Sequence, residues 1–225
     1  MENYLRRGLT AVRFRVDRRL DRASVSRAHD VLYESDAWTR ATWLGAQALK
    51  NPLDLWVYQE IMAETRPELV VETGTYRGGS ALFLASMCDL LGAGEVVTID
   101  LEPVRDDYPE HPRITYLGGR SSTHPDVLAE IRARVDGKPT LVILDSDHSQ
   151  AHGESELAEY AQLIPVGGYL IVEDSNIGQI RKDLLPGPLE AIETFLATTS
   201  AFEIDRSREK FLITFNPSGY LRRVR

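Results

Sequence analysis

The sequence predicts an α/β fold, namely a doubly wound, Rossmann-like and mostly parallel seven-stranded sheet with an N-terminal helical extension and a C-terminal antiparallel hairpin. From about residue 65, short β-branched runs alternate with helix-like runs. The short runs are apolar throughout, which is typical of strands buried on both faces. Several of them stop at glycine or at an acidic residue, and in such sheets ligands bind at these carboxyl ends.

Composition agrees with a folded protein of one main domain. The chain has 225 residues, of which 43% are hydrophobic and 27% charged, as in ordinary globular domains. A single cysteine excludes a disulfide framework and any multi-cysteine metal site. There is no apolar run of transmembrane length and no signal-peptide pattern. We therefore expect a helical arm over residues 1–42, a larger domain over residues 43–225, a cytoplasmic location and no stable membrane insertion.

The formal charge of −8 is unevenly distributed. Residues 1–30 carry eight Arg against four acidic residues, a net of +4, which leaves −12 for the rest. The acidic body argues against nucleic acid as a partner. The basic arm fits an amphipathic helix with a solvated Arg face, and the alternatives are contact with a phosphate-bearing ligand, a membrane surface or an acidic neighbouring subunit. We expect a homo-oligomer in which the arm packs on that neighbour.

The predicted elements follow one another in a regular order. Residues 69–72 are an apolar strand that stops near Gly74, and residues 80–91 form a helix rich in Ala and Leu. The strand at 95–99 ends at Asp100. The pattern then repeats, with strands at 113–117, 140–144 and 169–172 and helices at 125–135, 154–163 and 188–198. Late strands at 202–204 and 211–215 are expected to form the hairpin.

A glycine-rich turn joins the first strand to the first helix. Its spacing is G-x-x-x-G, unlike the G-x-G-x-x-G of dinucleotide sites, and glycine lets the backbone approach a ligand closely. Asp100 ends the next strand, where a carboxylate can accept hydrogen bonds from two ribose hydroxyls. A nucleoside-bearing cofactor is favoured over a purely structural turn. The candidate cofactor-binding residues are Glu72, Thr73, Gly74, Tyr76, Gly78, Ser80, Asp100, Ser121 and Asp145.

Two acidic clusters follow neighbouring apolar strands. The first contains Asp145, Asp147 and His148, and the second contains Glu173 and Asp174. Crowded carboxylates need a compensating cation or a raised pKa, and oxygen-rich sites with one histidine suit Mg²⁺ or Mn²⁺. The alternative is helix capping. His152-Gly153-Glu154 has the first half of an iron facial triad but no later histidine to complete it, so we expect His152 at the surface or in support of the site.

These strand-end residues resemble class I S-adenosylmethionine-dependent methyltransferases, and more narrowly the metal-dependent O-methyltransferases of catechols and macrolide sugars. The widest resemblance is to the cephalosporin hydroxylase family, over about residues 35–222. It rests on Trp43-Leu44-Gly45, on the run from Asn51 to Glu60, on Val71 to Thr75, on Leu144 to His148 and on Asp205 to Phe211. Members of this family look like methyltransferases, including enzymes for sugar hydroxyls and for cephem 7-methoxylation.

The resemblance implies a site in residue terms. Metal ligands are expected among Asp145, Asp147, Glu173 and Asp174, and the spacing of 28 residues from Asp145 to Glu173 matches the catechol type. A two-residue shorter spacing in the cephem member favours Asp147 over Asp145, whereas strand-end geometry favours Asp145, so both stay open. His148 falls at the position of the general base, and Asp145 and His148 are the expected catalytic residues.

The resulting hypothesis is an S-adenosylmethionine- and Mg²⁺-dependent O-methyltransferase domain. Its acceptor is expected to be a small molecule or oligosaccharide, with a vicinal diol of a sugar or glycosylated natural product favoured because two neighbouring oxygens can chelate a metal. Three alternatives remain: a cephem hydroxylation or methoxylation component, a nucleotide-dependent oxidoreductase, and a non-catalytic cofactor-binding partner of an oxygenase.

Overall fold

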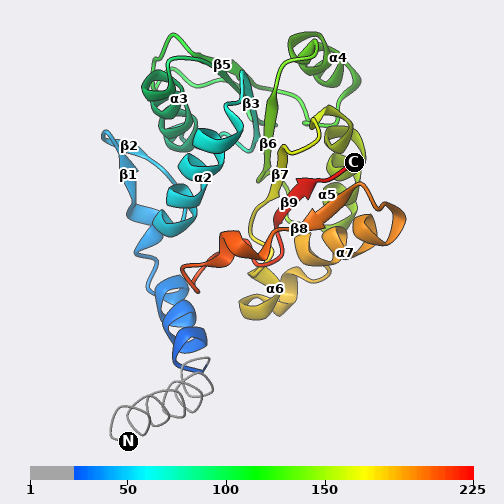
Figure 1. Ribbon diagram of the computed structural model, residues 1–225. Coiled ribbons are helices and arrows are strands. Elements are labelled where there is room, and N and C mark those ends of the chain that lie inside the picture. Colours follow the sequence, from blue (N-terminus) through cyan, green and yellow to red (C-terminus); the bar gives the residue numbers. More distant parts are fainter. Residues whose placement is uncertain (1–22) are drawn as a thin grey trace, which may run out of the picture.

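A seven-stranded sheet runs through the part of the chain that the computed structural model describes, residues 23–225. Its strands lie in the order β5-β4-β3-β6-β7-β9-β8 (Figure 1). The first five are parallel, and β9 is antiparallel to both β7 and β8. The bounds are β3 Leu69–Thr73, β4 Glu95–Ile99, β5 Ile114–Leu117, β6 Thr140–Leu144, β7 Tyr169–Val172, β8 Phe202–Ile204 and β9 Tyr220–Arg223. The predicted fold class is confirmed.

Helices cover both faces of the sheet. On one face, α2 (Pro52–Thr65) and α3 (Gly79–Leu91) share a core with one set of strand side chains. On the other face, α4 (Pro125–Val135), α5 (Gln150–Tyr160) and α7 (Pro188–Thr198) pack against the opposite set (Figure 1). Every residue of β3 and β6 is buried, which explains why these strands are mostly apolar.

Short elements complete the described chain. A small antiparallel pair, β1 (Thr42–Trp43) and β2 (Ala46–Gln47), precedes α2. The others are η1 (Trp38–Arg40), η2 (Ala161–Leu163), α6 (Ile177–Ile180), η3 (Lys182–Leu184) and η4 (Arg206–Glu209). The sequence reading did not identify the β1–β2 pair, because two-residue strands carry no periodicity.

The predicted C-terminal hairpin exists, but one of its strands was misplaced. β8 lies at the predicted position, whereas its partner is β9 and residues 211–215 form no strand. The backbone N–H of Phe215 donates to the Asp54 carboxylate at 2.9 Å, and the Thr214 hydroxyl donates to the same group. These donors are therefore bound by a buried side chain of α2 instead of a neighbouring strand.

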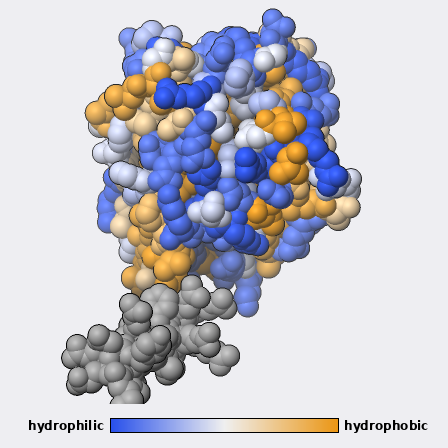
Figure 2. Space-filling model, viewed as in Figure 1, coloured by the Kyte–Doolittle hydropathy of each residue, from blue (hydrophilic) through white to orange (hydrophobic). Residues whose placement is uncertain are grey.

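The N-terminal part that the structure describes is a helix over residues 23–34. His29, Tyr33 and Trp38 each make a ring contact with Phe215, with centroids 5.3–5.7 Å apart. Most of the basic arm, residues 1–22, lies outside the described residues. Among residues 23–225 no helix has both the length and the apolar character needed to cross a bilayer, and on the face in Figure 2 hydrophobic residues lie in separate patches among hydrophilic ones.

Candidate active site

A cavity of about 950 Å³ opens at the carboxyl ends of β3, β4 and β6. Its position follows the rule that ligands bind at these ends of an open parallel sheet. Six of the predicted cofactor residues line it, namely Gly74, Tyr76, Ser80, Asp100, Ser121 and Asp145. Glu72, Thr73 and Gly78 are not in its wall, although all three belong to the same strand and turn.

The glycine turn is in direct contact with the end of β6. Gly74 has a φ of +88°, and a Cβ atom there would lie 1.8 Å from the backbone oxygen of Asp145. Only glycine fits this conformation and this approach. The backbone N–H of Asp145 in turn donates to the carbonyl oxygen of Thr73 at 3.1 Å. The cofactor turn and the first acidic residue are thus held together by backbone contacts.

Asp100 organises the same turn from the end of β4. Its Oδ2 accepts the backbone N–H groups of Thr75 and Tyr76, both at 2.9 Å. Its Oδ1 accepts the N–H of Glu102 at 2.9 Å. The carboxylate therefore fixes the backbone of the turn while it lines the cavity, where the remaining lone pair of Oδ1 can accept from a ligand.

Glu72 is a buried carboxylate behind the turn. Its Oε2 accepts the hydroxyl of Thr98 at 2.7 Å, whereas its Oε1 has no hydrogen-bond partner among residues 23–225. Burial raises the pKa of this carboxyl above its usual range. A buried carboxylate with an unmade hydrogen bond is costly, and Glu72 lies behind the turn, outside the wall of the cavity.

Asp145, His148 and Asp174 form the cluster that could hold a metal ion. One candidate ligand atom from each lies within 4.8 Å of the others. The Nε2 atom of His148 is 3.1 Å from Asp174 Oδ2 and 3.6 Å from Asp145 Oδ1. These two carboxylates stabilise the protonated imidazole and raise the pKa of His148 to about 10, against the opposing effect of burial. Two carboxylates and one imidazole make an oxygen-rich donor set that suits Mg²⁺ or Mn²⁺.

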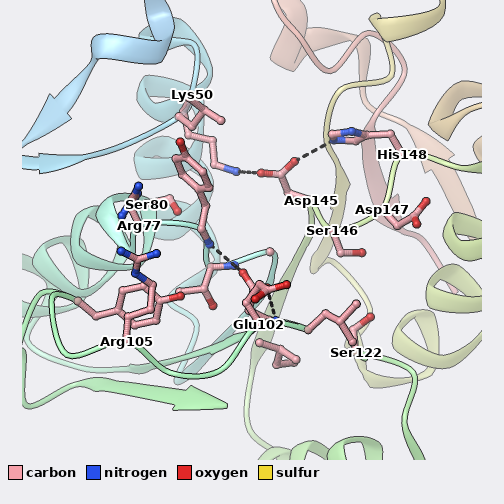
Figure 3. Close-up of a pocket in the computed structure, with 18 of the residues that line it drawn as sticks. Lys50, Arg77, Ser80, Glu102, Arg105, Ser122, Asp145, Ser146, Asp147 and His148 are labelled. Atoms are coloured by element: carbon pink, nitrogen blue, oxygen red, sulfur yellow. Dashed lines mark hydrogen bonds and ion pairs between the residues drawn. The ribbon is translucent and has the colours of Figure 1, made fainter. Parts of the chain in front are cut away.

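Lys50 is a buried cation that sequence reasoning did not identify. It follows β2, and its side chain is only 4% exposed. Its Nζ pairs with Asp145 and lies 2.7 Å from Glu173 Oε1. Burial opposes the charge on Lys50, but these two carboxylates outweigh that effect and raise its pKa. Figure 3 shows Lys50, Asp145 and His148 in a row, joined by dashed lines.

The two acids after β7 have different surroundings. Glu173 is 5% exposed, and burial raises its pKa well above the usual value despite the attraction of Lys50. Asp174 adopts a left-handed conformation with a φ of 52°. Its backbone N–H donates at 3.1 Å to Oδ1 of Asn216, whose Nδ2 donates at 2.8 Å to the Tyr58 hydroxyl. This buried amide holds the bend that brings the Asp174 carboxylate to His148.

Asp147 lies outside this cluster. Its Oδ1 accepts the backbone N–H of Ser149 at 2.7 Å, and Ser149 caps α5 by accepting from His152. In Figure 3 the Asp147 carboxylate lies to one side of the row that Asp145 and His148 form. The capping alternative thus describes Ser149 and the local role of Asp147. It does not account for Asp145 and Asp174.

A second cavity, of about 850 Å³, adjoins the first at Ser146, Asp147 and His148. Its far wall is formed by residues 183–186, part of the segment between α6 and α7. Arg181, just before that wall, pairs with Asp183 at 2.7 Å. The space beside His148 is therefore lined on one side by polar groups from the end of β6 to α5, and on the other by residues 183–186, which combine Asp183 with Leu184, Leu185 and Pro186.

Comparison with known proteins finds matches over most of the chain. A family model described as "Rhamnosyl O-methyltransferase/CmcI" matches residues 35–224. The rhamnosyl O-methyltransferase of Mycobacterium leprae is 37% identical over 203 residues, which are 86% of this chain and 87% of the relative.

Two solved structures of CmcI show the same fold. The apo form has a TM-score of 0.63 and 25% identity and covers 83% of this chain and 77% of its own. A form with Mg and S-adenosylmethionine has a TM-score of 0.63 and 22% identity and covers 83% of this chain and 78% of its own.

Proposed function

Since the chain belongs to the Rhamnosyl O-methyltransferase/CmcI family, we propose that it transfers a methyl group from S-adenosylmethionine to a hydroxyl of a sugar or glycoside with the help of Mg²⁺. Membership confirms the predicted enzyme class, an O-methyltransferase. The observation that carries the site assignment is the cluster of Asp145, His148 and Asp174 next to the Gly74 turn. It joins a metal-binding donor set to a cofactor cavity within one pocket.

The residues of this chain fit both S-adenosylmethionine and Mg²⁺. S-adenosylmethionine would lie in the 950 Å³ cavity, with the Gly74 turn and Asp100 on its nucleoside side and Ser121 nearby. Asp145 and Asp174 would hold the metal, with Glu173 as a further candidate ligand. Asp147 is the less favoured alternative to Asp145, because its carboxylate already caps the backbone of Ser149. When bound, S-adenosylmethionine supplies the methyl group and Mg²⁺ lowers the pKa of a hydroxyl that it contacts.

His148 is proposed as the general base that accepts the acceptor's proton. Its Nε2 faces the carboxylates of Asp145 and Asp174, which orient the ring and stabilise the imidazolium that proton transfer creates. The same carboxylates keep His148 protonated in the protein alone. Ligands that compete for these carboxylates, or that bring positive charge beside the ring, would lower its pKa toward the range where it can act as a base.

The adjoining 850 Å³ cavity is the proposed acceptor space. It begins at His148 and has hydrogen-bonding side chains on the α5 wall, including Gln150 and Glu154. Leu184 and Leu185 on the opposite wall offer apolar contact. This combination of hydrogen-bonding and apolar side chains suits a sugar ring, which carries hydroxyls on its edge and C–H groups on its faces. A vicinal diol remains the favoured acceptor feature.

The direct test is methyl transfer from labelled S-adenosylmethionine to a panel of rhamnosides, other glycosides and free sugars. We expect transfer to at least one glycoside, loss of activity on chelation, and recovery with Mg²⁺. Asp145→Asn and Asp174→Asn should each lose Mg²⁺ activation, because each loses a charged oxygen ligand.

Asp147→Asn is the matched comparison, since it changes an acid in the same loop that lies outside the cluster. We expect it to retain Mg²⁺ activation. An Asp147 variant more impaired than the Asp145 variant would reverse the assignment of the metal ligand. Tighter binding of NAD than of S-adenosylmethionine would refute the proposed cofactor.

A further inference from the structure

A buried hydrogen-bond cluster on α5 lies next to the proposed site, and its residues are not among those assigned to the cofactor, the metal or the base. Its centre is Glu156, which is 2% exposed. The single atom Oε1 of Glu156 accepts the Ser122 hydroxyl at 2.6 Å and the Ser146 hydroxyl at 2.8 Å. His152, one turn earlier on the helix, places Nε2 at 3.2 Å from Ser122 Oγ and at 3.5 Å from the same Glu156 oxygen.

The combination of serine, histidine and carboxylate does not form a nucleophilic triad. In such a triad the serine and the acid bind opposite nitrogens of the imidazole, so that one nitrogen takes the proton while the other is held. Here Ser122 and Glu156 both face Nε2 of His152. The Ser122 hydroxyl also donates directly to the carboxylate. The cluster is arranged to hold two loops and cannot activate the serine in this way.

The two serines belong to the two loops on which the proposed chemistry depends. Ser122 follows Ser121 in the loop after β5, and its carbonyl oxygen accepts the Tyr160 hydroxyl at 2.8 Å. Ser146 directly follows Asp145 in the loop after β6. Both serines line the cavity, and in Figure 3 both lie on the same side of it, below Asp145. One carboxylate oxygen therefore joins the cofactor side of the pocket to its metal side.

We propose that Glu156 is a positioning residue for methyl transfer, which sets the separation between the Ser121–Ser122 loop and the loop of Asp145 and His148. The inference rests on the proposed function, because it assigns the two loops to cofactor and metal. A carboxylate suits this task since hydrogen bonds to a charged acceptor are shorter and stronger than neutral ones. In-line transfer is sensitive to position, and a misplacement of about 1 Å can lower the rate roughly 10²-fold.

The experiment tests the bond from Glu156 to Ser122 and the bond from Glu156 to Ser146 separately. Ser122→Ala removes the bond from Glu156 to the cofactor loop and leaves the bond to Ser146, so we expect weaker binding of S-adenosylhomocysteine in calorimetry, by about 10-fold, with little change in kcat. Ser146→Ala frees only the loop of Asp145, so we expect kcat to fall, by up to about 10²-fold, with unchanged S-adenosylhomocysteine affinity. Glu156→Leu should show both defects, and Glu156→Gln should recover most of each because its amide oxygen still accepts both hydroxyls.

Glu159→Gln is the matched control, because Glu159 lies on the same helix but pairs at the surface with Arg132. It should leave both readouts at the wild-type level. Equal losses of thermal stability in both serine variants, without the split between affinity and kcat, would overturn the proposal and leave Glu156 a purely structural residue. If Glu156→Leu fails to fold, the two serine variants still test whether Glu156 positions the two loops. A wild-type protein that binds no S-adenosylhomocysteine would refute the proposed function itself.

Discussion

Replacement of Lys50 by methionine should strongly destabilise the metal-free protein. Methionine keeps the length and much of the volume of the side chain but removes the charge between Asp145 and Glu173. The Lys50 side chain is 4% exposed and that of Glu173 is 5% exposed, and Nζ lies 2.7 Å from the Glu173 carboxylate. Removal of one partner from a buried ion pair leaves an uncompensated charge, at a cost of about 3–5 kcal/mol. This is a large part of the ~5–15 kcal/mol that keeps a typical domain folded.

The pH dependence of this loss has a definite sign. Burial already raises the pKa of Glu173 despite the attraction of Lys50, so without Lys50 this carboxylate takes up a proton still more readily in the folded protein than in the unfolded chain. The folded state then binds more protons, so its stability rises as the pH falls. We expect the loss to be largest near pH 8 and to shrink toward pH 5. Mg²⁺ should recover more stability in Lys50→Met than in the wild type, because a divalent cation can compensate the same carboxylates.

The assay is urea denaturation with a chelator and then with excess Mg²⁺, at both pH values. Lys138→Met is the control, because Lys138 pairs with Glu95 at 3.1 Å but both side chains are more than a third exposed. Such surface pairs contribute about 0–1 kcal/mol. If Lys50→Met costs no more than Lys138→Met in the metal-free protein, the view of Lys50 as the resident counter-cation is wrong.

Three further predictions concern single residues. Asp100→Ala should weaken S-adenosylmethionine binding by about 1.5–3 kcal/mol in calorimetry, the value of hydrogen bonds to a charged group; an unchanged affinity would exclude Asp100 from the cofactor site. His148→Ala should lower turnover roughly 10²–10⁴-fold, with the deficit shrinking at high pH as hydroxide replaces the base; a flat pH profile at wild-type rate would contradict this role. Burial raises the pKa of Asp54 to about 6, so the folded protein binds the extra proton and its stability should fall as the pH rises from about 4 to 6. Asp54→Asn should lose this dependence in urea titrations, whereas equal slopes would contradict the assignment.

The sequence predicts the parts of the site that lie at strand ends. A parallel sheet brings the carboxyl ends of its strands to one edge, so a residue that follows an apolar run can be placed without coordinates. Gly74, Asp100 and Asp145 were located in this way. The same reasoning could not choose between Asp145 and Asp147, because the choice depends on side-chain direction within a loop. In the structure, the Asp147 carboxylate accepts the backbone N–H of Ser149, the residue that caps α5.

The residues that support the site could not be found by this reasoning. Lys50 meets Asp145 across 95 positions of sequence, and nothing in its immediate neighbours marks a buried lysine. Its only signal is that it directly precedes the Asn51-Pro52 run shared with the family. Asn216, which holds the bend at Asp174, lies 42 positions away from it. The misplaced strand at 211–215 has the same origin, because Asp54 on a distant helix binds its backbone.

The charge balance at the site explains why a lysine lies among the acids that follow β6 and β7. Asp145, Glu173 and Asp174 would together carry three negative charges in a region of low exposure, where like charges repel strongly. Lys50 compensates Asp145 and Glu173 from one side, and protonated His148 compensates Asp145 and Asp174 from the other. The metal-free site can therefore remain assembled without a divalent ion. If Asp145 and Asp174 held Mg²⁺, the ion would compensate the same carboxylates as the His148 proton, and the imidazole would then be free to accept a proton while Lys50 stays paired with Glu173.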